Sequence, residues 1–180
     1  MCAIALESDN IIDPCWHRTK FIYPCERAKS HLIKYDTEHP DFIREYSGEG
    51  ISRMMKTLRE HGFFVTYNHP SWSLENLDVY KNYDGMNAIE IYNTSCNATG
   101  LLSNDSHCYD DMLRNNKRIY CIAADDNHHD YDILDGRSDS FGAFVMIKAD
   151  KLEYRTVTKA LEDGNFYAST GPSIYELYFD

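Results

Sequence analysis

The sequence predicts a single α/β domain built on a mainly parallel sheet with helices outside. Its 180 residues, 43% of them apolar, are enough for one domain with a sizeable core. Between residues 50 and 170, short runs rich in β-branched and aromatic residues alternate with segments of helical periodicity. This alternation indicates strand–helix–strand units, whose strands run parallel.

The first 49 residues depart from this pattern. Residues 2–6 predict a strand, and a long irregular stretch follows over residues 7–48, with three prolines. A stretch of this length is normally functional or packed on the surface. His17, His31 and His39 lie in it without partners at metal-ligand spacing, so we expect surface or packing roles for them.

The repeating part has the spacing of βα units. The helices expected from apolar periodicity and end signals are 50–61, a short helix begun by Ser73, 108–115 and 151–163. The strands expected between them are 63–67, 87–92, 119–124 and 143–148. Residues 166–169 and 174–179 predict either a final strand pair or a strand and an extended tail, and residues 171–180 can equally begin a further β region.

Composition excludes several classes of function. The net charge of -11 disfavours binding to nucleic acid, whose phosphates require Lys and Arg. No apolar stretch is long enough for a membrane span, and the N-terminus lacks the features of a signal peptide. The six cysteines show no CxxC spacing, so we expect a cytoplasmic protein with reduced, mostly structural thiols.

The strand at 119–124 is followed at once by a run of Asp, Asn and His. In α/β folds ligands bind just past the C-terminal ends of strands. Asp126 and His128 lie two residues apart, so in an extended segment their side chains share a face. A carboxylate and an imidazole together suit zinc, manganese or iron. The alternative is a solvated loop in an acidic protein.

Two more candidate residues lie on earlier strands, one at a strand end and one inside a strand. His69 follows the strand at 63–67 and precedes Pro70, which ends the strand. A histidine in that place is often structural, but here it is the third residue with a metal-binding side chain at the end of a strand. Glu90 lies inside the strand at 87–92, where it points either into a polar barrel centre or to solvent at an edge.

These segments together resemble the PHP (polymerase and histidinol phosphatase) family of metal-dependent phosphoesterases. The resemblance covers residues 50–178 in the family's order, through GFFVTYNHPSW at 62–72, GMNAIEIYN at 85–93, IAADDNHH at 122–129 and 140–177. It implies a distorted (β/α)7 TIM-like barrel, here partial, with metal ions at the C-terminal ends of its strands. The family's N-terminal His-x-His strand has no counterpart in this sequence, so we expect a chain that lacks the N-terminal strands.

The resemblance also assigns roles to individual residues. It implies that His69 is the histidine of the family's His-Pro motif and that Asp126 and His128 are its late Asp-x-His pair, all three binding metal. Glu90 and Asn93 match a Glu-x-x-Asn that supports the site from a neighbouring strand. Further residues are expected in or around the pocket: Asp125, His129, Arg137 and Trp72.

The function that this resemblance implies is hydrolysis of a small phosphorylated substrate by metal-activated water, impaired by the missing ligands. Arg137 either holds a phosphate by a bidentate contact or forms a surface salt bridge. Trp72 either lines the pocket or packs in the ordinary way. We leave the catalytic residues unassigned.

Two alternative functions remain. The first is a non-catalytic PHP-like module that binds at most one metal and serves in assembly. The second is a metal-dependent amidohydrolase. The strand at 2–6 would be left as an unpaired edge, a template for another chain, so we expect a homo-oligomer.

Overall fold

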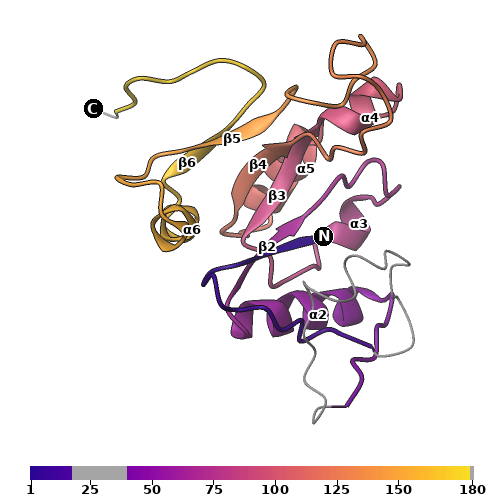
Figure 1. Ribbon diagram of the computed structural model, residues 1–180. Coiled ribbons are helices and arrows are strands. Elements are labelled where there is room, and N and C mark those ends of the chain that lie inside the picture. The colour runs from indigo at the N-terminus through magenta and orange to yellow at the C-terminus, as the bar shows by residue number, and fades with distance from the viewer. Residues whose placement is uncertain (18–39, 179–180) are drawn as a thin grey trace.

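The computed structural model describes residues 1–17 and 40–178. That part of the chain holds six strands and five helices, which alternate except where α5 follows α4 and β5 follows β4 (Figure 1). The strands are β1 (Cys2–Ala5), β2 (Phe63–Tyr67), β3 (Ala88–Asn93), β4 (Tyr120–Ala124), β5 (Phe144–Ile147) and β6 (Phe166–Ser169). The helices are α2 (Gly48–Glu60), α3 (Leu77–Tyr80), α4 (Thr94–Ala98), α5 (Ser106–Arg114) and α6 (Tyr154–Glu162).

The strands form two sheets. The larger has the order β1-β2-β3-β4, with β2, β3 and β4 parallel and β1 antiparallel to β2. The smaller is the antiparallel pair β5-β6, which lies against β4. Because β2, β3 and β4 run the same way, their C-terminal ends meet at one edge of the sheet, which the short helix α4 marks in Figure 1.

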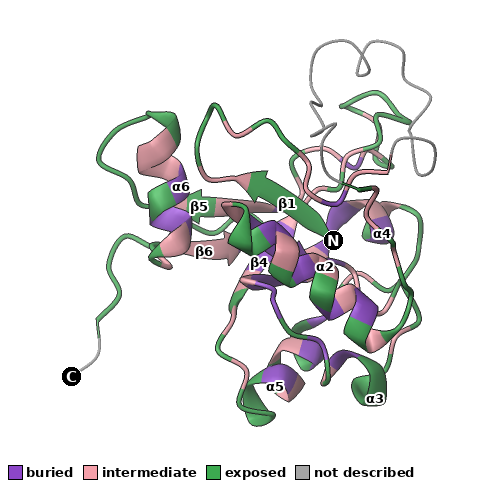
Figure 2. Cartoon of the chain, turned by 90° about the horizontal axis from the view of Figure 1, so that it is seen from below, coloured by how far each residue is buried: buried purple, intermediate pink, exposed green. Residues whose placement is uncertain are grey.

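Apolar side chains cover both faces of the larger sheet. On one face Val65 and Ile89 pack with residues of α2, α3 and α5, among them Met55 and Met112. On the other face Phe64 and Ile122 pack with residues of β5, β6 and α6. Figure 2 shows that α2 and α5 each carry both buried and exposed residues, as expected of amphipathic helices with one side against a sheet.

Local sequence explains the ends of α2. Ser47 caps its N-terminus, with Oγ accepting a hydrogen bond from the backbone N–H of Gly50. At the other end Gly62 has φ +81, the left-handed conformation that commonly terminates a helix and that glycine adopts without strain. The turn at Gly62 leads directly into β2.

The expected strands and long helices coincide with the observed ones to within a few residues, but several details differ. Residues 94–98, expected as loop, form α4, because the Asn93 side chain accepts a hydrogen bond from the Cys96 N–H and starts a helix. The short helix expected after Ser73 begins later, at α3, and Asn76 caps it. Residues 174–178 form no strand.

The partial TIM-like barrel stays a prediction. Over residues 1–17 and 40–178 the two sheets do not close into a barrel. The strand expected at 2–6 forms β1, an edge strand that pairs with β2 on its inner side. The irregular segment expected at 7–48 lies in part outside the described residues. None of the described helices has the length and apolar character needed to cross a membrane.

We predict that Gly85→Ala destabilises the fold, because Gly85 has φ +105 and an added Cβ would lie 2.8 Å from the backbone nitrogen of Lys56 in α2. Strain of this kind costs about 2 kcal/mol. Urea unfolding measures the loss. The matched control is Gly136→Ala, where a Cβ meets nothing within 4 Å. Equal stability of the two variants would contradict the prediction.

Candidate functional site

The predicted metal ligands lie together at the C-terminal edge of the sheet. His69 follows β2, and Asp126 and His128 follow β4. All three line one pocket of about 400 Å³, and so does Trp72. The remaining lining residues are Ser95, Cys96, Thr99, Leu101 and Asp130.

Glu90 is buried at this edge of the sheet, with 1% of its surface exposed. Its carboxylate accepts hydrogen bonds from the backbone N–H of His69 (2.8 Å), from Asn68 Nδ2 (3.2 Å) and from Asn93 Nδ2 (3.2 Å). Of the two orientations that the sequence allows, the inward one is therefore observed. Burial nevertheless raises the pKa of Glu90, although the three hydrogen bonds act to lower it.

Asn93 connects this buried carboxylate to the pocket. Besides its bond to Glu90, its Nδ2 donates to Asp126 Oδ2 at 3.1 Å. Its Oδ1 accepts the Cys96 N–H at 2.8 Å and so fixes the start of α4. One amide thus orients the Asp126 carboxylate and positions the helix that forms a wall of the pocket.

The two pocket histidines are each anchored through one ring nitrogen. Nδ1 of His69 lies 3.1 Å from Ser73 Oγ, and its ring packs edge-on against Trp72. Nδ1 of His128 lies 3.1 Å from Ser95 Oγ and 3.6 Å from Asp139 Oδ2. Within the described residues neither Nε2 has a protein hydrogen-bond partner. Anchoring one nitrogen leaves the other for a metal, as is usual for ligating histidines.

The backbone at the site is not extended, contrary to the expectation for residues 126–128. Asp126 has φ 51 and His129 has φ 58, both left-handed. The side chains of Asp126 and His128 share the pocket because the chain turns after β4, and not through strand alternation. His69 also has a positive φ, 34°. Such conformations are uncommon outside glycine and cluster at functional sites.

Asp125 and His129 differ in what surrounds them. The Asp125 carboxylate accepts the backbone N–H groups of Phe141, Gly142 and Ala143, so it attaches the loop before β5 to the end of β4. The His129 side chain is exposed and does not line the pocket.

Arg137 is engaged on the surface. Its guanidinium forms a bidentate pair with Asp135 at 3.0 and 2.7 Å and lies over the ring of Tyr131. This contact lowers the pKa of Asp135 to about 2. The arrangement matches the surface salt bridge rather than the phosphate contact.

The pocket donors would have to move to share one ion. Among the described residues, one group of three metal-ligand types has its donor atoms within 4.8 Å of one another, and it is Asp105, His107 and Cys108. Asp126 and His128 are exposed and lie on a loop after β4. The donor types suit a divalent transition metal.

Sequence reasoning missed the group of Asp105, His107 and Cys108. The sequence Asp-x-His-Cys at 105–108 contains three metal-binding side chains in close succession, but its position at the start of a predicted helix favours a structural thiol for Cys108. Cys108 is indeed 1% exposed, and burial raises the pKa of its thiol to about 11.

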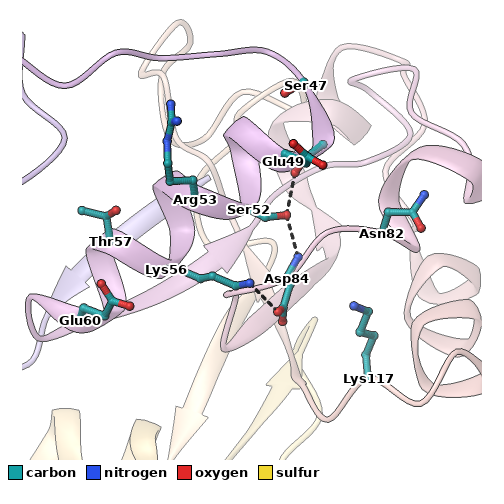
Figure 3. A pocket seen from close by; sticks show the side chains of 11 residues that line it. Ser47, Glu49, Ser52, Arg53, Lys56, Thr57, Glu60, Asn82, Asp84 and Lys117 are labelled. Carbon is teal, nitrogen blue, oxygen red and sulfur yellow. Dashed lines mark hydrogen bonds and ion pairs between the residues drawn. The ribbon is translucent and has the colours of Figure 1, made fainter.

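A larger cavity, of about 780 Å³, lies over the exposed face of α2 (Figure 3). Three of its polar groups contact one another: Lys56 pairs with Asp84 at 2.9 Å, and Ser52 Oγ accepts the Asp84 N–H. No residue predicted from the sequence to act in the site lines it. The smaller pocket, which the predicted metal ligands line, is therefore the candidate functional site.

Comparisons with protein-family models, with curated proteins and with solved structures gave no match. The resemblance to the PHP family stays a prediction.

We predict that Glu90→Gln changes how stability depends on pH. The raised pKa means that folded protein binds the Glu90 proton more tightly than the unfolded chain does. The contribution of Glu90 to the free energy of unfolding therefore falls as pH rises above the unfolded pKa, towards the folded one. Glutamine does not titrate, so the free energy of unfolding of wild type minus that of the variant should decline over that pH window.

Urea unfolding at a series of pH values from about 4 upward measures this difference. Glu60→Gln, at an exposed position on α2, is the control. Parallel stability curves for wild type and Glu90→Gln would show that Glu90 does not titrate as burial requires.

Proposed function

We propose that this chain is a metal-dependent phosphoesterase that holds one divalent transition metal through His69, Asp126 and His128. The observation that carries the proposal is the convergence of these side chains in one pocket above the buried Glu90 and Asn93. The resemblance to the PHP family names the same residues independently of the structure.

The donor set supports zinc, manganese or iron. Two imidazoles and one carboxylate are a common set for a catalytic metal, which keeps one position open. A bound metal would supply Lewis acidity to a phosphoryl oxygen and to the attacking water.

The chain's own residues prepare this site. Ser73 and Ser95 fix the Nδ1 atoms of His69 and His128, and Asn93 orients the Asp126 carboxylate. Trp72 packs against the His69 ring and limits its rotation, although half of the indole is exposed. Such partners limit the orientations that each ligand side chain can adopt and leave the other ring nitrogen of each histidine for the metal.

A second function is a metal-binding module without catalysis. It is favoured by the charges around the pocket, whose described lining holds Asp126 and Asp130 but no Lys or Arg. Arg137, the candidate phosphate ligand, is paired with Asp135. Such a pocket offers an anionic substrate no protein cation.

Both proposed functions require the pocket to bind a metal, and measuring the metal content of the chain tests this. Protein purified without chelator, and again after soaking with zinc or manganese, is analysed by plasma mass spectrometry. We expect wild type to hold one metal per chain more than His69→Ala and Asp126→Ala hold. His61→Ala, an exposed histidine on the far side of β2 from the pocket end, should retain it. Equal metal content in all four proteins would contradict the site.

Hydrolysis then separates the two functions. The metal-loaded chain is assayed with p-nitrophenyl phosphate as a generic ester. Turnover that disappears in Asp126→Ala supports the phosphoesterase. A bound metal that depends on His69 and Asp126, without turnover, supports the non-catalytic module.

We also propose that the chain forms a homo-oligomer through β1. This strand is at the edge of the larger sheet, and within the described residues its outer side pairs with no strand. Cys2 and Ile4 are exposed on it. Light scattering should give a mass of at least twice 20.9 kDa. A monomer across the accessible concentration range would rule out this assembly.

A further inference from the structure

We propose that Asp105, His107 and Cys108 form a second metal site, selective for zinc or a similarly thiophilic divalent cation. The three lie at the start of α5, outside the pocket. One donor atom from each lies within 4.8 Å of the other two. This site is independent of the proposed phosphoesterase and uses none of its ligands.

The distances already approach those of a tetrahedral site. Cys108 Sγ lies 3.3 Å from His107 Nε2 and 3.8 Å from Asp105 Oδ1. Bond lengths of about 2.3 Å for Zn–S and 2.0 Å for Zn–N place neighbouring tetrahedral ligands about 3.5 Å apart. Both of these separations therefore lie within a few tenths of an ångström of the spacing that a tetrahedral ion requires.

The Asp105 carboxylate is buried without a counter-ion. It is 1% exposed, and within the described residues no Lys, Arg or His forms an ion pair with it. Its hydrogen bonds come from neutral groups, the N–H and Oγ of Ser71 and the thiol of Cys108, and all three fall on Oδ1. Buried carboxylates are normally paired or bound to a metal, and a bound cation would supply the opposite charge that Asp105 lacks.

Exposure of the three donors fits a metal that enters from solvent. Asp105 and Cys108 are buried, whereas His107 is exposed. The ion would sit between the protein interior and the surface, with three protein ligands and a fourth position open to water. A thiolate ligand favours zinc over magnesium, calcium or manganese.

A metal bound by Asp105, His107 and Cys108 would also stabilise one side of the pocket. Asp105 holds Ser71, two residues after His69, by the backbone N–H at 3.1 Å. An ion bound to Asp105, His107 and Cys108 would connect the start of α5 to the turn that carries His69.

Cadmium titration tests the proposal, because cadmium replaces zinc in thiolate sites and gives an ultraviolet charge-transfer band. The chain of 180 residues is used in the Asp126→Ala background, so that the pocket does not compete for the ion. We expect a band that saturates at one equivalent and is reversed by zinc. Cys108→Ala should abolish it, and His107→Ala should weaken binding at least about tenfold.

Two controls keep the test decisive. His61→Ala removes another exposed histidine and should leave the affinity unchanged. If Cys108→Ala fails to fold, the surface variant His107→Ala still reports on the site. A band that persists in Cys108→Ala, an affinity unaltered in His107→Ala, or no band in the parent would overturn the proposal without bearing on the pocket.

Discussion

The buried Glu90 carboxylate is the constraint on which the edge of the sheet depends. A buried charge is costly unless donors surround it, and the nearest donors come from the residue after β2, from the His69 backbone and from Asn93. The hydrogen bonds to Glu90 therefore fix the path of the chain after the two neighbouring strands β2 and β3. Through Asn93 the same requirement extends to Asp126 beyond the third strand.

The turn that carries His69 is held between two buried carboxylates. Glu90 accepts the N–H of His69 itself, and Asp105 accepts the N–H of Ser71. These bonds explain how a histidine keeps a positive φ, because each fixes one side of the turn. The position of His69 is therefore a property of β3 and α5 as much as of its own strand.

Much of this fold could be predicted from the sequence because the signals are local. The strand at 63–67 and the helix ending at Gly62 follow from periodicity and a glycine. The clustering of His69, Asp126 and His128 followed from parallel strands ending together. The antiparallel pairing of β1 did not, because it depends on contacts between residues about sixty positions apart.

What sequence reasoning missed depends on single side-chain contacts. Helix α4 is polar and short, and only the Asn93 cap distinguishes it from a loop. The chain turns at Asp126, next to Asp125, whose carboxylate accepts hydrogen bonds from three successive backbone N–H groups just before β5. The proximity of Asp105 to Cys108 requires the start of α5 to be known within a residue.

The charge of the pocket sets an order of events for the proposed phosphoesterase. The chain carries a net charge of -11, and Asp126 and Asp130 line the pocket. An anionic ester would be repelled from this surface, whereas a divalent cation would be attracted to it. Metal binding must therefore precede substrate binding, since the ion would be the first positive charge in the pocket.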